Sequence, residues 1–302
     1  MRNPIKMIAH AWRVWSSLNQ RYPGVFAAAD AWRQFHRVWL PARIPYRAAG
    51  MALAKMAEID EMETDRFRVR VPERGITFYW PRRPDANLYY TLEQEFNFRN
   101  PHYYTTRPIR LVRESRILDV GACEGLFALR TAKAGDATKV FCFEPDAHMS
   151  RLIELAALEN DVSNVIQVVN EAVAMDSGEV SFATEDGPEG GRLVAEGGSK
   201  IPATSLDDFC RRRELELTRE DLIKIDAEGA DLDVLKGAEK CIRERAPQIA
   251  VTTYHTDDHC HEIIDYLRSV QPGYRLRLKG FSFWTPVPRP VLLQASIPAE
   301  IS

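Results

Sequence analysis

Several acidic side chains and one histidine follow short apolar runs in this sequence, where they could bind a ligand or take part in catalysis. Asp119 and Glu144 lie at the ends of two such runs, Asp226 and Glu228 follow a third, and His255 follows a fourth. Carboxylates accept hydrogen bonds from hydroxyl and ammonium groups and can act as general bases, and imidazole titrates near neutral pH. This pattern predicts a site for cationic or hydroxyl-bearing ligands.

A glycine-bearing turn follows the first apolar run. In Asp119-x-Gly121-x-x-x-Gly125 the glycines let the backbone turn tightly and approach a ligand closely. The spacing differs from the G-x-G-x-x-G dinucleotide fingerprint, and the acids at 119 and 124 would repel a pyrophosphate but tolerate a sulfonium ion. Glu144, nineteen residues after Gly125, is placed to accept hydrogen bonds from both ribose hydroxyls. The alternative is that the glycines only shape a strand–helix turn and Glu144 is a solvated strand end.

The third and fourth runs predict the reaction centre. Asp226 and Glu228 lie at a strand end before Gly229, and either carboxylate could act as a base or position an acceptor hydroxyl. Their alternative role is helix N-capping, since acids are favoured in the first turn of a helix. His255 is expected at the same sheet edge as a further general base. Residues 255–261 hold three histidines, two aspartates and a cysteine, which are side chains that can bind a metal ion. Because His259 and His261 would fall on different faces of a helix, we expect no metal.

The pattern from residue 117 onward predicts the scaffold that positions these residues. Apolar runs typical of strands occupy 117–121, 138–143, 165–169, 222–225, 248–253, 274–278 and 290–294. Helix-like stretches include 146–160, 229–243 and 258–270. This alternation indicates a mostly parallel sheet with helices on both faces and ligands at the carboxyl ends of its strands. Residues 171–208 interrupt it with an expected hairpin around Asp176–Gly178 and a glycine-rich loop at 187–198.

The preceding residues show different patterns. Apolar stripes along 7–19 and from Val25 to Trp39, broken by Pro41, and a third stretch at 48–59 predict helices. Residues 66–80 alternate and turn at 73–75, which predicts a β-hairpin. Residues 86–114 have no clear period. The predicted division is a basic, Trp-rich helical arm at 1–60, a hairpin and connecting or lid segment at 61–114, and a catalytic domain at 115–302.

Composition limits the class of protein. The 302 residues are 45% hydrophobic and 27% charged, as in ordinary soluble proteins. No window approaches the roughly 18 apolar residues that a membrane span needs. No signal peptide is expected, because Arg13 and Arg21 interrupt the first apolar residues. Five scattered cysteines without a C-x-x-C favour free thiols and a cytoplasmic location.

The N-terminal arm is strongly basic. Residues 1–57 hold nine Lys or Arg and one acid, a charge of +8 in a chain whose net charge is −3. Four of the six tryptophans precede residue 40. The arm could bind the inner face of an anionic membrane as an interfacial helix, or pack on the acidic remainder of the chain or on a second subunit. We favour packing. Nucleic acid is not an expected partner, since no recognised RNA-binding module is present.

Residues 115–295 resemble the FkbM-type methyltransferases, a class I group that uses S-adenosylmethionine and mostly methylates hydroxyl oxygens of sugars and polyketide-like molecules. The segments that carry the resemblance are Asp119–Gly125 (DVGACEG), Phe143–Pro145 (FEP), Thr204–Asp207 (TSLD), Leu222–Gly229 (LIKIDAEG) and Val234–Gly237 (VLKG). Cys123 departs from the Asn common in the family. The resemblance implies a Rossmann-like, seven-stranded α/β fold with S-adenosyl-L-methionine as cofactor.

Together these features predict a methyltransferase acting on a hydroxyl of a sugar, glycolipid or other small metabolite, with a free or a glycan- or lipid-linked acceptor. The catalytic candidates are Asp226, Glu228 and His255. The predicted cofactor contacts are Asp119, Gly121, Ala122, Cys123, Gly125, Glu144, Pro145, Glu171, Ala172 and Asp226. The alternatives are a non-catalytic protein of the same fold that binds cofactor or anchors a partner, and a nucleotide-binding oxidoreductase. A homo-oligomer is left open.

Overall fold

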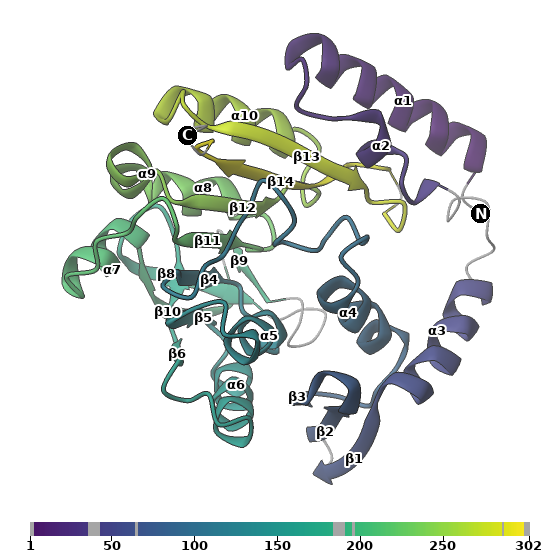
Figure 1. Cartoon of the computed structure of the whole chain (residues 1–302), viewed down its shortest axis with the longest axis vertical. Coiled ribbons are helices and arrows are strands. Elements are labelled where there is room, and N and C mark those ends of the chain that lie inside the picture. Colours follow the sequence, from purple (N-terminus) through teal and green to yellow (C-terminus); the bar gives the residue numbers. More distant parts are fainter. Residues whose placement is uncertain are drawn as a thin grey trace.

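A seven-stranded sheet forms the centre of the structure (Figure 1). The computed structural model describes residues 3–35, 43–63, 66–183, 191–194, 197–285 and 287–298. The strands of this sheet are β4 (Arg116–Val120), β5 (Lys139–Phe143), β6 (Ile166–Val169), β11 (Leu222–Ile225), β12 (Gln248–Thr252), β13 (Arg275–Phe281) and β14 (Pro290–Ser296). Their order is β13-β14-β12-β11-β4-β5-β6, and β14 is the one strand of this sheet that runs in the opposite direction to the other six. Each predicted apolar run coincides with one strand, so the mostly parallel sheet is confirmed.

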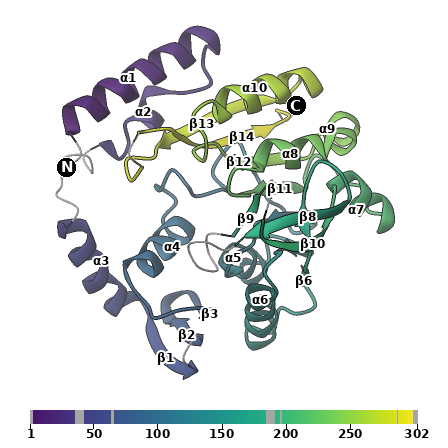
Figure 2. The same cartoon turned by 180° about the vertical axis from the view of Figure 1, so that it is seen from behind.

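Helices cover both faces of the sheet, as predicted (Figures 1 and 2). Successive side chains of a strand point to opposite faces, and in β4 Leu118 and Val120 join one core cluster while Ile117 joins the other. The first cluster includes buried residues of α1 (Pro4–Arg21), α7 (Leu206–Arg212), α8 (Asp231–Lys236), α9 (Glu239–Arg245) and α10 (His259–Val270). The second includes those of α4 (Ala86–Phe96), α5 (Leu126–Ala134) and α6 (Ala147–Glu159). The cofactor and acceptor candidates therefore sit on a scaffold with two apolar cores.

The single helix predicted over 229–243 is wrong, because the structure breaks it into α8 and α9. At the break, a Cβ on Gly237 would lie 2.3 Å from the carbonyl oxygen of Ala174, so the backbones meet there. The backbone N–H of Asp207 donates to the Gly237 carbonyl at 2.9 Å. The Asp207 carboxylate accepts from the backbone N–H groups of Lys240 and Cys241 at 2.8 and 2.9 Å. These contacts begin a second helix where the hydrophobic period predicts a continuous one.

The hairpin predicted around Asp176–Gly178 is also wrong. The strands on either side of that turn, β7 (Ala172–Val173) and β8 (Gly178–Ala183), do not pair with each other. Both pair with β10 (Ser199–Thr204), in a four-stranded sheet of order β7-β10-β8-β9 that ends on β9 (Arg192–Val194). Ser177 explains the difference, since its hydroxyl accepts from the backbone N–H of Ser205 at 3.0 Å and donates to Asp208 at 2.6 Å. Part of the predicted glycine-rich loop lies outside the described residues.

The second N-terminal helix is shorter than predicted. The helix α2 (Ala28–Ala31) is followed by turns to residue 35, and the predicted Trp39 and Pro41 lie outside the described residues. The Val25 carbonyl accepts from the backbone N–H of Leu278 in β13 at 2.7 Å, and buried Asp30 accepts from Arg277 at 2.8 Å. The segment therefore lies along β13, and these tertiary contacts override the helical period. The third predicted stretch, 48–59, lies mostly in α3 (Arg43–Met56), but the helix ends at Met56 and a strand begins at Glu58, so the last predicted residues are not helical.

The helix α1 packs on the C-terminal part of the chain (Figure 1). Met7, Ala11 and Leu18 are buried in the first core cluster, and Tyr22 donates to Asp265 of α10 at 2.8 Å. This supports the packing interpretation of the arm. Trp12, however, is 54% exposed, and a membrane contact or a second subunit stays a prediction. No helix in the described part of the chain is long and apolar enough to cross a membrane.

An antiparallel sheet of β1 (Glu58–Glu63), β2 (Arg66–Val71) and β3 (Ile76–Trp80) precedes α4. The pairing of β2 with β3 confirms the predicted hairpin, whose turn contains the 3-10 helix η2 (Pro72–Arg74). The helix α4 was missed. Its buried positions mix Leu88 and Leu92 with Glu95, so the sequence shows no clean apolar stripe. The three-part domain division stays a prediction.

Candidate active site

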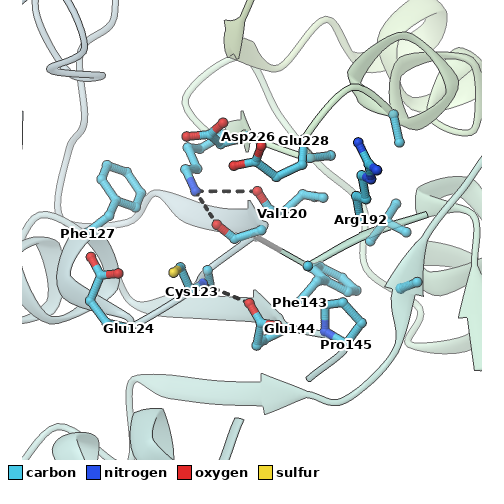
Figure 3. A pocket seen from close by; sticks show the side chains of 18 of the residues that line it. Val120, Cys123, Glu124, Phe127, Phe143, Glu144, Pro145, Arg192, Asp226 and Glu228 are labelled. Carbon is cyan, nitrogen blue, oxygen red and sulfur yellow. Dashed lines mark hydrogen bonds between the residues drawn. The ribbon is translucent and has the colours of Figure 1, made fainter. Parts of the chain in front are cut away.

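A cavity lies at the carboxyl ends of β4, β5 and β11, the edge at which open α/β sheets bind ligands (Figure 3). The helix α4, the side chains of His102 and Tyr104, and the strands β8 and β9 supply further walls. The predicted residues that line it are Gly121, Ala122, Cys123, Glu144, Pro145, Ala172, Asp226 and Glu228. Asp119, Gly125, Glu171 and His255 lie outside the lining. The fold thus brings together residues from positions more than 100 apart in sequence.

The turn after β4 depends on Gly121. Its φ is +70°, and a Cβ there would lie 2.0 Å from the carbonyl oxygen of Asp226. The backbone N–H groups of Gly121 and Ala122 both lie 3.1 Å from the carbonyl oxygen of Phe143. The end of β4 therefore touches the ends of both neighbouring strands, which joins the predicted cofactor loop to the predicted reaction centre. Gly125 caps α5 at a φ of +72° and faces Ile153, so its role is to shape the turn.

Glu144 is buried at the end of β5, where it is 6% exposed. Its Oε2 accepts from the backbone N–H of Cys123 at 2.9 Å, and its Oε1 accepts from that of Asp146 at the same distance. Burial raises the pKa of Glu144 to about 8, although both backbone bonds favour the ionised form. A carboxylate has about four acceptor positions, so two remain for ligand hydroxyls. The solvated strand end considered from sequence is therefore not what forms.

Asp119 forms a buried ion pair with a lysine side chain of the same chain. Its carboxylate is fully buried and lies 2.9 Å from the Nζ of Lys224, which also donates to the Gly121 carbonyl at 2.6 Å. Burial raises the pKa of Asp119 against the attraction of Lys224. Burial opposes the charge on Lys224, but Asp119 and Asp226 outweigh it and raise the pKa of that ammonium group. Glu171 likewise has an internal partner, Arg212, at 3.2 Å.

Asp226 is held in place by two hydroxyl groups. Tyr104 donates to its Oδ2 at 2.7 Å, and Thr252 donates to its Oδ1 at 3.0 Å. The Nε2 of buried His102 lies 3.5 Å from Oδ2, and burial lowers the pKa of that imidazole to about 4. The helix α8 begins at Asp231 without a side-chain cap, so Asp226 and Glu228 do not cap it. Both acids are left facing the cavity.

His255 lies between three acids. Its Nδ1 is 3.0 Å from Oδ2 of Asp231, and its Nε2 is 3.5 Å from both Oδ1 of Asp226 and Oε2 of Glu228. Burial works against charge on the imidazole, but Asp231 and the other two acids raise the pKa of His255 to about 9. Burial and the nearby Asp226 raise the pKa of Glu228 to about 7. The cluster attracts positive charge, which a proton or another cation could supply.

Asp231 and the two hydroxyl donors, Tyr104 and Thr252, were not predicted from the sequence. Asp231 is fully buried and accepts from the backbone N–H groups of Ala227 and Gly229 at 2.9 and 3.2 Å. The Thr252 hydroxyl lies 3.0 Å from an oxygen of each acid, Asp231 and Asp226, and can donate its one proton to either. One of these residues could have been found from sequence. Thr252 ends the predicted strand after the one that precedes Asp226, so both were expected at the same edge of the sheet. Tyr104 gave no signal, because it comes from a segment without a period.

The sequence model of the family described as the methyltransferase FkbM domain matches residues 119–276, slightly more than half of the chain. The chain belongs to the FkbM methyltransferase family. This membership and the observed sheet confirm the predicted class I methyltransferase fold. The FkbM match begins at Asp119 of the glycine turn and ends within β13, so it spans Glu144, Asp226 and His255. It does not reach the arm or the three-stranded sheet.

Several solved structures align with parts of this chain. The methyltransferase FkbM of Methylobacillus flagellatus KT aligns with a TM-score of 0.46 and 22% identity over 70% of this chain and 54% of that one. The precorrin-6y C5,15-methyltransferase of Geobacter metallireducens GS-15 gives 0.38 and 14% over 63% and 83%. The Methanococcus jannaschii fibrillarin pre-rRNA processing protein gives 0.41 and 11% over 81% and 99%. The alignment spans about half of the Methylobacillus FkbM protein. No curated protein matches this chain.

Proposed function

We propose that this FkbM-family protein is an S-adenosylmethionine-dependent O-methyltransferase whose acceptor is a hydroxyl of a sugar, glycolipid or other small metabolite. The main support is that the Gly121 turn, Glu144 and Asp226 line one cavity. Among the described residues that line it, five are acidic (Glu95, Glu124, Glu144, Asp226 and Glu228) and two are Lys or Arg. An excess of carboxylates favours a sulfonium cation and repels a pyrophosphate.

The cofactor side of the cavity fits the proposed group. Gly121, which lines the cavity, lets the turn after β4 pack against the Asp226 backbone where a Cβ would collide, and Glu144 presents a buried carboxylate to a ribose diol. When bound, S-adenosylmethionine supplies an electrophilic methyl group on a sulfur that leaves as a neutral thioether. The Asp119–Lys224 pair holds the turn from beneath, since Lys224 bonds both the Asp119 carboxylate and the Gly121 carbonyl.

The acceptor side presents hydrogen-bond acceptors with fixed orientation. Transfer of a methyl group to oxygen requires an oriented hydroxyl that can lose its proton. Tyr104 and Thr252 hold the Asp226 carboxylate at the edge of the cavity, with Glu228 beside it. These carboxylates would accept the hydrogen bond of a substrate hydroxyl and align its oxygen. Incubating the protein with methyl-labelled S-adenosylmethionine and sugar or glycolipid acceptors tests this, and label on nitrogen or carbon instead of oxygen contradicts O-methylation.

Replacing Glu144 with alanine should weaken S-adenosylmethionine binding by about 2–3 kcal/mol, because a charge-assisted hydrogen bond to the ribose is lost. Isothermal titration calorimetry measures the change. Glu171→Ala is the matched control, since Glu171 lies outside the cavity and pairs with Arg212, and its dissociation constant should equal that of the unmodified chain. Equal affinities for both variants would remove Glu144 from the cofactor site. Absence of binding to the unmodified chain would reject the proposed function.

The affinity for S-adenosylmethionine should also depend on pH through Glu144. Its pKa is raised to about 8 without ligand, and hydroxyl donors favour the ionised carboxylate. Binding therefore releases a proton below pH 8, and affinity should rise between pH 6 and 8, by up to about tenfold per unit, and then level off. Calorimetry from pH 6 to 9 measures this. The Glu144→Gln variant gives the dependence that comes from the ligand itself, and identical pH profiles would contradict the assignment.

A further inference from the structure

We propose that Asp226, Glu228 and His255 bind one divalent transition-metal cation at the acceptor end of the cavity. The three ligand atoms are Oδ1 of Asp226, Oε2 of Glu228 and Nε2 of His255, and all lie within 4.8 Å of one another. Each carboxylate oxygen is 3.5 Å from Nε2. Ligand atoms about 2.0–2.2 Å from one metal lie roughly 3 Å apart at right angles, so a small inward shift completes the set.

The Nε2 atom of His255 also points to a bound cation. The side chain is nine-tenths buried, and its Nε2 has no hydrogen-bond partner among the described residues although it points between two carboxylates. The other ring nitrogen is fixed by Asp231 at 3.0 Å. A carboxylate that accepts from Nδ1–H directs the lone pair of Nε2 outward, which is how proteins orient histidine toward a metal. A lone pair facing two carboxylates is repelled unless positive charge, from a proton or a metal ion, lies between them.

The surrounding charges favour a cation at this place. Asp226, Glu228 and Asp231 contribute three carboxylates, and the nearby Lys224 already bonds Asp119. A second cluster, Asp231 with His255 and His259, is less suited, because the Asp231 oxygens already accept from two backbone N–H groups and from His255. Asp226 and Glu228 line the cavity, so a metal there keeps open positions toward a ligand. Asp231 acts as a positioning residue for His255.

The ligand types define the class of cation. Two carboxylates and an imidazole suit Mn²⁺, Fe²⁺ or Zn²⁺, whereas Mg²⁺ and Ca²⁺ prefer oxygen ligands alone. The role of the metal rests on the proposed function: bound to the acceptor oxygen, it would lower the pKa of that hydroxyl. From sequence no metal was expected, because His255 was considered only with its sequence neighbours His259 and His261. The fold groups it instead with two acids that follow another strand.

Titration of the chelator-treated full chain with Mn²⁺, followed by the electron paramagnetic resonance signal of free Mn²⁺, tests the site. We expect one Mn²⁺ per chain. Glu228→Gln and Asp226→Asn should each weaken Mn²⁺ binding by more than about 100-fold. Loss of a residue that only contacts a metal ligand costs up to about 100-fold, and loss of a ligand itself should cost more. Glu124→Gln is the matched control, because Glu124 lines the same cavity outside the cluster and its loss should leave Mn²⁺ affinity unchanged. Circular dichroism melting curves confirm that each variant is folded.

Equal Mn²⁺ affinity of the unmodified chain, Glu228→Gln and Asp226→Asn would overturn the proposal, as would no binding at all. Either result would make the cluster an ion pair of protonated His255 with its acids. Calorimetry with S-adenosylmethionine on the same metal-free samples keeps the two proposals separate. Cofactor binding without Mn²⁺ binding rejects the metal site alone, and Mn²⁺ binding without cofactor binding supports the metal site while rejecting the methyltransferase function.

Discussion

Replacing Gly121 with alanine should lower the free energy of unfolding by about 2–5 kcal/mol and abolish cofactor binding. The added Cβ would lie 2.0 Å from the carbonyl oxygen and 2.9 Å from the carbonyl carbon of Asp226. Both atoms are backbone, so no rotamer change relieves the overlap and β4 must separate from β11. Overpacking costs about 1–3 kcal/mol, and a positive φ adds about 1–2 kcal/mol for a residue with a side chain. Urea denaturation and calorimetry with S-adenosylmethionine measure the two effects.

The matched control is Gly135→Ala at the end of α5. Gly135 has a φ of +71°, close to that of Gly121, but a Cβ there would meet nothing within 4 Å. This variant isolates the backbone term, so it should lose only about 1–2 kcal/mol and bind cofactor normally. Equal losses of stability in the two variants would mean that the close approach between the Gly121 turn and Asp226 does not exist.

Replacing Lys224 with methionine should destabilise the chain by about 3–5 kcal/mol near neutral pH, because it leaves the fully buried Asp119 without its partner. Asp119 would then take up a proton more readily, so the loss should shrink as pH falls. The exposed pair of Lys236 and Asp233, at 3.1 Å, gives the control. Lys236→Met should cost less than about 1 kcal/mol. Urea denaturation at pH 5 and 7 measures both, and similar losses for the two lysines would contradict a structural role for the buried pair.

The central sheet could be predicted because most of its strands are short, largely apolar runs, even where a single polar residue such as Asp119 or Lys224 lies among them. Residues such as Ile117, Val140 and Leu222 are fully buried, and strands covered on both faces leave a continuous hydrophobic signal. Strand ends in a parallel sheet share one edge, so the convergence of Gly121, Glu144 and Asp226 also follows from sequence. Local chemistry and a simple topological rule were sufficient for these features.

Features that depend on contacts between distant segments could not be predicted. Glu95 interrupts the stripe of α4 because it is paired with Arg130 of α5 at 3.3 Å. The His255 imidazole is oriented by Asp231, an acid that follows a different strand, and nothing in the spacing of the two reveals the contact. The strand β10 separates β7 from β8 because strand pairing is decided by tertiary packing as well as by turns. In a sequence, a charged residue that is buried against a partner looks the same as one on the surface.

The segment that includes Val25 and Asp30 lies along β13, the outermost strand at one side of the seven-stranded sheet. An uncovered edge strand offers backbone N–H and C=O groups to which a strand of another molecule can add. Here Val25 occupies the N–H of Leu278, and Asp30 holds the Arg277 side chain. The N-terminal segment therefore shields the sheet from intermolecular strand addition. It lies before the matched family domain, so protection from aggregation and the proposed chemistry are carried by separate parts of the sequence.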